Sequence, residues 1–328
     1  MYKVEIIGVG SYTPDNIVTN DDLSHIVETN DEWITTRTGI RERRISSGEN
    51  TSDLAIKAAI IAMKVANISS VDLDLIIVAT ITPDSFTPST ACIVQGKIGA
   101  LNAMCFDINA ACTGFLYAIN IATQFIKTGT YRNALIIGVE TLSKIVDWTN
   151  RNTCILFGDG AGAAVLNRST TSGIVSIDTY SDGSKGEYLY CPAVPLRNLF
   201  IKDKIGKYSF VSMNGREVFK FAVKVIPECI EKILKDTGYS LNDIKYIVPH
   251  QANSRIIESA AKKLNIDESK FYMNLDRYGN TSAASIPIAL SEIFQKKIIS
   301  KGDKIILIGF GGGLTYGVAL INWTIEDK

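Results

Sequence analysis

Residues 104–126 read Met-Cys-Phe-Asp-Ile-Asn-Ala-Ala-Cys-Thr-Gly-Phe-Leu-Tyr-Ala-Ile-Asn-Ile-Ala-Thr-Gln-Phe-Ile. They predict a short strand, a turn of small residues and, beyond Gly114, a helix whose apolar spacing is typical of a largely buried one. Cys112 is expected at the first turn of that helix, where unpaired backbone N–H groups and the helix dipole favour the nucleophilic thiolate. The alternative is a buried structural cysteine, which is common in apolar runs.

On both sides of this stretch, apolar strands alternate with amphipathic helices, which favours an α/β fold built in layers. Continuous apolar runs such as Leu-Ile-Ile-Val-Ala-Thr at 75–80 are typical of strands buried on both faces. We expect strands at 3–9, 75–80, 104–108, 134–140, 246–249, 271–275, 304–309 and 315–323. We expect helices at 21–28, 52–66, 89–99, 112–126, 214–236, 252–264 and 281–297.

The second half of the chain repeats the element order of the first half. Three pairs of residues share a nearly constant offset: Val78 with Val248 (170), Cys112 with Asn280 (168) and Gly138 with Gly309 (171). This pattern indicates an internal duplication. We therefore predict two halves, 1–168 and 169–328, related by a pseudo-two-fold axis, with a site where equivalent strand ends meet.

Composition excludes several classes of protein. The 328 residues are 46% hydrophobic, and 34 basic residues balance 34 acidic ones, so a broad nucleic-acid or anionic-membrane surface is not expected. The six cysteines form no CxxC pair, which predicts reduced thiols and neither a metal site nor a disulfide framework. Polar residues or glycines interrupt the long uncharged runs, and residues 1–10 form a strand pattern, so we expect a cytoplasmic protein without membrane spans or a signal peptide.

The chain contains two histidines, and only one is placed for chemistry. His25 lies in a polar helix, whereas His250 comes directly after a buried strand. The duplication brings the turns that hold Cys112, His250 and Asn280 towards one place. A nucleophile beside a histidine is typical of covalent catalysis. The alternative for His250 is a capping or core-edge role.

These residues lie in motifs that closely resemble the β-ketoacyl-acyl-carrier-protein synthase III family of the thiolase superfamily. The motifs are Asp31-Glu-Trp-Ile-Thr-Thr-Arg-Thr-Gly-Ile-Arg-Glu-Arg43, Ala110-Ala-Cys-Thr-Gly-Phe115, Phe157-Gly-Asp-Gly-Ala-Gly-Ala-Ala164, Pro249-His-Gln-Ala-Asn253, Gly279-Asn-Thr-Ser-Ala-Ala284 and Phe310-Gly-Gly-Gly313. The resemblance covers essentially the whole chain and implies a duplicated, thiolase-like αβαβα layered fold. It also implies that Cys112, His250 and Asn280 are catalytic.

The implied activity is that of an acyltransferase that initiates type II fatty-acid synthesis. Cys112 would take the acyl group of a short acyl-CoA, which is a substrate, so no cofactor is expected. His250 and Asn280 would stabilise the enolate formed when malonyl-acyl-carrier-protein loses carbon dioxide. The backbone N–H groups of Cys112 and of the loop Gly311, Gly312 and Gly313 would hold the oxyanion, and Phe310 would shield the site.

The resemblance also implies the contacts with substrates and partners. Trp33 and Arg37 would sandwich the adenine of coenzyme A, Arg151 would lie near the nucleotide, and Asn253 would contact pantetheine. Four basic residues match a patch that meets the acidic carrier protein, although a solvated face is the plain alternative: Lys220, Arg255, Lys262 and Lys263.

The family implies a homodimer whose partner subunit closes the acyl pocket. Thr87, next to Phe86, stands where the family often has phenylalanine, so a deeper pocket for branched or longer primers is expected. Three alternatives remain. They are a condensing enzyme of secondary metabolism, a thiol hydrolase, and a scaffold that binds acyl-CoA or carrier protein without catalysis.

Overall fold

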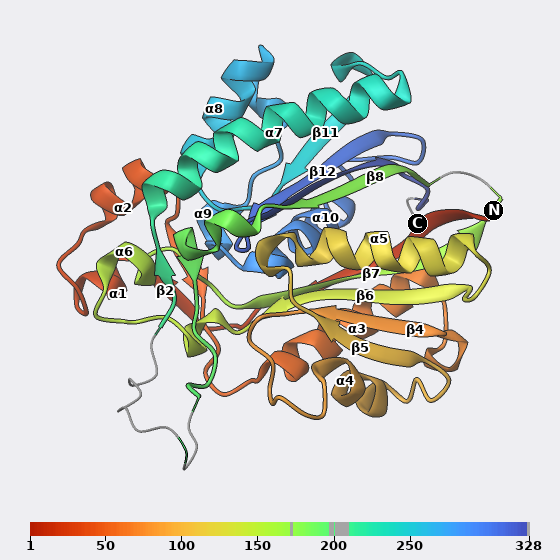
Figure 1. Cartoon of the computed structure of the whole chain (residues 1–328), viewed down its shortest axis with the longest axis horizontal. Helices are drawn as coiled ribbons and strands as arrows, with labels where there is room; N and C mark the ends of the chain where they lie inside the picture. Colours follow the sequence, from red (N-terminus) through yellow and green to blue (C-terminus); the bar gives the residue numbers. More distant parts are fainter. Residues whose placement is uncertain (171–172, 197–199, 201–209, 327–328) are drawn as a thin grey trace.

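The computed structural model describes residues 1–170, 173–196, 200 and 210–326. Two sheets and three layers of helices are stacked in the order helix, sheet, helix, sheet, helix (Figure 1). The predicted α/β layering is therefore confirmed. Within the described ranges, no helix is both long and apolar enough to cross a lipid bilayer.

The first sheet has the strand order β1-β7-β6-β4-β5. Its strands are Lys3–Tyr12 (β1), Gly160–Ser169 (β7), Asn133–Glu140 (β6), Leu75–Ala79 (β4) and Met104–Ile108 (β5). β4 runs parallel to β5 and β6, and every residue of β4 and β6 is buried, as their continuous apolar runs predict. The outer face packs on helices Thr51–Ala66 (α3) and Thr90–Ile98 (α4).

The second sheet has the order β11-β12-β13-β8. Its strands are Ile244–Pro249 (β11), Lys304–Gly311 (β12), Thr315–Asn322 (β13) and Ile174–Ser181 (β8). Its outer face packs on helices Gly215–Thr237 (α7) and Ser254–Leu264 (α8). β11 is parallel to β12, and β12 pairs antiparallel with β13. In the first sheet β4, β6 and β7 pair in the same directions.

Helices Gly114–Lys127 (α5) and Ser285–Gln295 (α10) form the layer between the sheets (Figure 1). Residues of both helices and both sheets join one apolar cluster there. The predicted halves, 1–168 and 169–328, thus share a buried interface, and the turns before α5 and α10 meet inside it.

Shorter elements gather at one end of the layers, on the left in Figure 1. They are Ile17–Thr19 (β2), Asn20–Ser24 (α1), Asp31–Thr38 (α2), Glu42–Arg44 (β3), Arg151–Cys154 (α6), Leu189–Tyr190 (β9), Ser212–Met213 (β10) and Leu275–Tyr278 (α9). The fully buried Arg43 side chain ties this end together by donating to Val18 O, Asn20 Oδ1 and Ile155 O.

The predicted strand at 271–275 is wrong. Phe271 makes one parallel bridge with Ile247, and α9 already begins at Leu275. The backbone N–H of Asn274 donates to the side-chain oxygen of Gln251, so it does not continue a strand ladder. A side chain that bonds the backbone offers the chain an alternative to a sheet.

The duplication has an offset of 171 residues in the paired elements that flank the turns of Cys112 and Asn280. β6 begins at Asn133 and β12 at Lys304, while α5 begins at Gly114 and α10 at Ser285. The 3-10 turns that precede the two helices, Ala111–Thr113 and Ser282–Ala284, follow the same offset.

This offset corrects one predicted correspondence. The counterpart of Cys112 is Ala283, and the counterpart of Asn280 is Asn109. Two residues after each asparagine, the chain takes a left-handed conformation, with φ of 44° at Ala111 and 48° at Ser282. The catalytic candidates are therefore not symmetry mates. Each lies in its own half of a paired turn, at a different position.

Candidate active site

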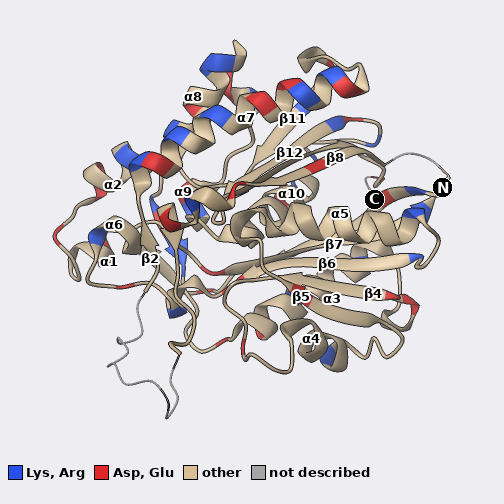
Figure 2. Ribbon diagram, in the orientation of Figure 1, with Lys and Arg blue, Asp and Glu red and all other residues tan. Residues whose placement is uncertain are grey.

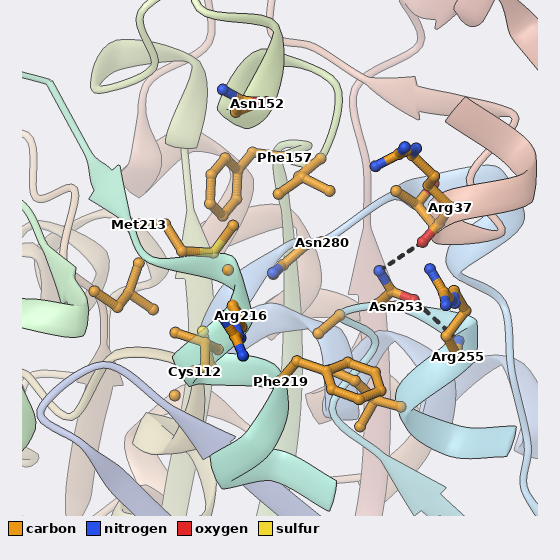
Figure 3. Close-up of a pocket in the computed structure, with 18 of the residues that line it drawn as sticks. Arg37, Cys112, Asn152, Phe157, Met213, Arg216, Phe219, Asn253, Arg255 and Asn280 are labelled. Carbon is orange, nitrogen blue, oxygen red and sulfur yellow. Dashed lines mark hydrogen bonds between the residues drawn. The ribbon is translucent and has the colours of Figure 1, made fainter. Parts of the chain in front are cut away.

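One cavity of about 740 Å³ is lined by the three predicted catalytic side chains. Two of them, Cys112 and Asn280, are labelled in Figure 3. Cys112, His250 and Asn280 all line it, and they come from the ends of different strands and turns. The remaining walls are mainly apolar, with Leu156, Phe157, Leu189, Met213, Phe219 and Phe310 among them. The structure thus brings together a thiol, an imidazole and an amide at one end of an apolar tunnel.

Cys112 lies in the 3-10 turn before α5, one turn earlier than predicted, and is only 6% exposed. The backbone N–H groups of Cys112 and Gly312 hydrogen-bond its sulfur. A side chain on Gly311 would overlap Cys112, because an added Cβ would lie 2.7 Å from Cys112 Cβ and 3.1 Å from its Sγ. Glycine at residue 311 therefore permits this close approach.

The expectation of a thiolate at Cys112 is not met by the electrostatics of the site. Burial raises the pKa of this thiol to about 11, and the charge of Glu140 raises it further, whereas hydrogen bonds from Ser282 and the backbone lower it. Desolvation outweighs the helix end because the sulfur is enclosed. At neutral pH Cys112 is a thiol, and its attack on an electrophile requires a proton acceptor.

His250 follows β11 directly and is 1% exposed. Burial lowers the pKa of its imidazole to about 3, so the ring is neutral at physiological pH. Its Nδ1 lies 2.6 Å from Ser285 Oγ, and the ring packs edge-on against Phe310. When the Ser285 hydroxyl donates to Nδ1, the ring proton is on Nε2, which makes Nε2 a hydrogen-bond donor.

The Asn280 side chain points into the cavity (Figure 3). Its Oδ1 accepts a hydrogen bond of 2.9 Å from the backbone N–H of Ser282. This contact fixes the amide orientation, so that Nδ2 is the atom available to a ligand. Asn280 and His250 are therefore both suited to donate a hydrogen bond to one oxygen.

Thr315 joins the turn of Cys112 to the glycine loop. Its Oγ1 lies 3.1 Å from Ala110 O, 2.9 Å from Gly312 O and 3.0 Å from Thr113 Oγ1. The hydroxyl has one proton to donate among these acceptors. Sequence reasoning missed this residue because two of its partners, Ala110 and Thr113, lie about two hundred positions away.

Both arginines predicted near the nucleotide stack on Trp33. The guanidinium carbons of Arg37 and Arg151 lie 4.7 and 4.9 Å from the centre of the Trp33 ring. A flat base between two stacked planes needs a separation of about 7 Å, twice a van der Waals contact. The exposed Arg37 side chain must therefore move outward to admit one. Asn253 Nδ2 donates to Arg37 O, as the dashed line in Figure 3 marks.

The predicted docking residues are exposed on α7 and α8, whose Lys and Arg positions are blue in Figure 2. Lys220 and Arg255 line the cavity mouth, and Lys220 pairs with Glu217. Lys262 and Lys263 lie in the last turn of α8, outside the cavity lining. Arg216, which sequence reasoning did not assign, also lines the mouth.

Phe86 and Thr87 lie on an exposed loop before α4 and do not line this cavity. Phe86 is 82% exposed. A role in the acyl pocket therefore requires a second copy of the chain, as the resemblance implied. In the described part of the chain, no three His, Cys, Asp or Glu side chains are arranged to hold a metal ion.

Comparison with known proteins places this geometry in context. The family model described as 3-Oxoacyl-[acyl-carrier-protein (ACP)] synthase III matches residues 106–183, and the model of its C terminal part matches residues 234–323. A β-ketoacyl-[acyl-carrier-protein] synthase III from Clostridium novyi is 60% identical over 98% of this chain and 100% of its own length. The enzyme of that name from Clostridium acetobutylicum is 57% identical over 99% and 100%.

Solved structures show the same likeness. The 3-oxoacyl-[acyl-carrier-protein] synthase III from Aquifex aeolicus superimposes with a TM-score of 0.92 and 47% identity, covering 98% of this chain and 100% of that one. A priming β-ketosynthase of the R1128 polyketide pathway superimposes with a TM-score of 0.90 and 32% identity, covering 98% and 97%.

Proposed function

This chain belongs to the 3-oxoacyl-[acyl-carrier-protein] synthase III family, and from that membership we propose what each residue of its site does. Its thiolase fold and its activity follow from the family: it is an acyltransferase that carries out the initiating condensation of fatty-acid synthesis. The prediction made from the motifs is confirmed at this level. The observation that supports the residue roles is the convergence of Cys112, His250 and Asn280 in one apolar cavity.

The first half-reaction transfers an acyl group to Cys112. The sulfur attacks the thioester carbon of a short-chain acyl-CoA, the bond to the coenzyme A sulfur breaks, and coenzyme A leaves with a proton. The backbone N–H groups of Cys112 and Gly312, which hydrogen-bond the sulfur, are assigned as the donors to the oxyanion that develops beside it. Phe310, which packs against His250, helps to keep water out.

The second half-reaction joins the acyl group to a malonyl unit on acyl carrier protein. Carbon dioxide leaves, and the resulting enolate oxygen accepts hydrogen bonds from His250 Nε2 and Asn280 Nδ2. The carbanion attacks the acyl-enzyme, which releases 3-oxoacyl-acyl-carrier-protein and restores Cys112. Two neutral donors in an apolar cavity favour loss of the carboxylate without an added base, and no cofactor takes part.

The mouth of the cavity supports binding of the two substrates. We assign the adenine of acyl-CoA to the Trp33 ring, with Arg37 and Arg151 beside it and Asn253 on the pantetheine. The carrier protein carries its phosphopantetheine into the same opening. Its acidic surface fits the exposed cations of α7 and α8: Lys220, Arg255, Lys262 and Lys263.

We further propose a homodimer in the cytoplasm, where acyl-CoA and carrier protein are found. In that dimer the exposed loop with Phe86 and Thr87 closes the acyl pocket of the partner subunit. A threonine at residue 87 leaves room for a branched or longer primer. The mass of the protein in solution tests the dimer. The best primer of wild type, compared with that of Thr87→Phe, tests the pocket, and the variant should prefer shorter primers.

A condensing enzyme of secondary metabolism is the remaining functional alternative, in view of the likeness to the priming β-ketosynthase. The Clostridium relatives are nearly twice as similar in sequence, which favours fatty-acid synthesis. Product assays with a panel of acyl-CoA primers and malonyl carrier protein distinguish the two. Formation of 3-oxoacyl product by wild type but not by Cys112→Ala supports the proposal, and a protein that binds primers without turnover would be a scaffold.

A further inference from the structure

Glu140, the last residue of β6, is completely buried and lies near Cys112. The reaction described above gives Glu140 no role. Its Oε2 accepts hydrogen bonds from Thr80 Oγ1 at 3.1 Å and Thr82 Oγ1 at 2.7 Å, and the backbone N–H of Ile81 donates to both carboxylate oxygens. Its Oε1 accepts from Ser282 Oγ at 3.2 Å. These four donors favour the ionised carboxylate, against the cost of its burial.

Ser282 connects this carboxylate to Cys112. Its hydroxyl, which donates its one proton to Glu140 Oε1, also interacts with the Cys112 sulfur and can accept a hydrogen bond from the thiol, so sulfur, hydroxyl and carboxylate form one hydrogen-bonded series. Ser282 has a φ of 48°, and its backbone N–H donates to Asn280 Oδ1. This hydrogen-bonded series crosses the interface between the two halves of the molecule.

The internal duplication shows that the layered fold does not require a glutamate here. The counterpart of Glu140, 171 residues later, is Gly311 at the end of β12. There the strand has no side chain, and its backbone lies close to Cys112. In the first half the equivalent strand end instead carries a carboxylate towards Ser282.

The acylation step needs a proton acceptor, and the buried groups differ in their fitness for it. Burial raises the pKa of the Cys112 thiol to about 11 and lowers that of His250 to about 3, which makes His250 a weak acceptor. Burial raises the pKa of Glu140 to about 7, against the hydrogen bonds that lower it. Two titratable groups, Cys112 and Lys144, interact electrostatically with Glu140.

We propose that Glu140, acting through the Ser282 hydroxyl, accepts the proton of Cys112 when the acyl-enzyme forms. The Cys112 proton moves to Ser282 Oγ as the Ser282 proton moves to Glu140 Oε1, and the sulfur forms its bond to the acyl carbon. The bond to the coenzyme A sulfur breaks, and the departing thiolate takes the proton back along the same hydrogen-bonded series. Glu140 is thus a positioning residue, and the inference rests on the acyl transfer proposed above.

If Glu140 acted only through its charge, Glu140→Gln would speed acylation of Cys112, whereas the relay predicts that the variant slows it. Removing a negative charge near a thiol lowers its pKa, so Glu140→Gln would then raise the reactivity of Cys112. In the relay, the same variant loses the acceptor and slows acylation by about 100-fold at pH 8, the scale of general-base catalysis. The readout is the rate of acyl-enzyme formation from acyl-CoA between pH 5.5 and 9, with iodoacetamide as a second probe of Cys112.

For wild type we expect the rate to rise with pH to an inflection near 7, where the carboxylate ionises, and then to level off. Glu140→Gln and Ser282→Ala should both lose the inflection. A Gln variant that is acylated as fast as wild type, or faster, would overturn the relay. If wild type forms no acyl-enzyme, the proposed function fails, and the iodoacetamide profile still decides whether Glu140 assists Cys112.

Two threonine variants keep the test valid if Glu140→Gln fails to fold. Thr82→Val removes the shortest hydrogen bond to the carboxylate, so it should move the inflection to higher pH. The matched control is Thr123→Val, because the hydroxyl of Thr123 is buried in α5 without a hydrogen-bond partner in the described chain. It should leave the profile unchanged. An inflection that does not respond to Thr82→Val would assign the titration to another group and refute the relay.

Discussion

Gly311 and Cys112 touch across the interface between the two halves of the chain. A methyl group on Gly311 would lie 2.7 Å from Cys112 Cβ and 3.1 Å from the Cys112 backbone nitrogen and sulfur. The second half thus supplies the backbone against which Cys112, the proposed nucleophile, is held. The cavity that holds the proposed catalytic residues forms where the two halves pack together.

Gly311→Ala should therefore abolish formation of the acyl-enzyme and lower the free energy of unfolding by about 2 kcal/mol, the scale of overpacking in a core. Urea unfolding and intact-protein mass after mixing with acyl-CoA measure the two effects. Gly96→Ala in α4 is the matched control, since an added Cβ there meets no atom within 4 Å. Equal stability and acylation in the two variants would show that the contact is unimportant.

Asn280→Asp replaces the Nδ2 donor with a negatively charged oxygen at nearly the same volume. The enolate would lose a donor and face a like charge, so release of carbon dioxide from malonyl carrier protein should fall by 100-fold or more, on the order of losing an oxyanion donor. Acylation of Cys112 should persist. Asn152→Asp, in the same cavity lining, is the control and should condense normally. Undiminished carbon dioxide release by Asn280→Asp would remove Asn280 from the mechanism.

We assign the Ser285 hydroxyl as the donor in its 2.6 Å contact with His250 Nδ1, which predicts a single tautomer with the proton on Nε2. Nitrogen NMR of the histidine ring reads the tautomer directly. Ser285→Ala should allow the other tautomer and slow condensation by about tenfold, the value of one hydrogen bond. Ser291→Ala, a second buried serine of α10, is the control. A wild-type ring that carries its proton on Nδ1 would contradict this assignment.

The burial of neutral His250 also predicts how stability depends on pH. Its pKa falls from 6.5 in the unfolded chain to about 3 in the folded protein, so below pH 6.5 only the unfolded state takes up the proton. The contribution of neutral His250 to the free energy of unfolding is therefore fully present above pH 6.5 and is lost as the pH falls towards 3. Between pH 6.5 and 5 this residue should cost about 2 kcal/mol of unfolding free energy, at 1.4 kcal/mol per unit of pH.

Urea unfolding of wild type and His250→Gln at both pH values isolates this contribution. The loss on acidification should be smaller in the variant by that amount. His25→Gln, which removes the exposed second histidine, is the matched control. Identical losses in wild type and His250→Gln would mean that His250 is accessible to protons in the folded state.

Much of the fold can be predicted because the strands and the helices of each layer have distinct patterns of apolar residues in the sequence. β4 and β6 are continuous apolar runs, and α5 carries an apolar pattern on most of its faces. The predicted strand at 271–275 fails for a local reason, since Asn274 bonds Gln251 in place of a neighbouring strand. The short elements around Trp33 follow no such periodicity, because the buried Arg43 holds them with hydrogen bonds to distant carbonyl groups.

The members of the site could be named from motifs, but their ionisation could not. The position of Cys112 before a helix suggests a thiolate, whereas full burial in three dimensions makes it a thiol. The contact between Ser282 and Glu140 joins residues 142 positions apart, so no local pattern shows it. The stacking of Arg37 and Arg151 on the Trp33 ring likewise depends on how the side chains pack, so the sequence alone does not show it.

The most direct test of the central claim is the intact mass of the protein after mixing with acyl-CoA, followed by addition of malonyl carrier protein. The account predicts an adduct of one acyl group on wild type and none on Cys112→Ala. It also predicts that malonyl carrier protein discharges the adduct to 3-oxoacyl carrier protein. An adduct that forms without Cys112, or one that water alone removes, would contradict a condensing enzyme built on this cysteine.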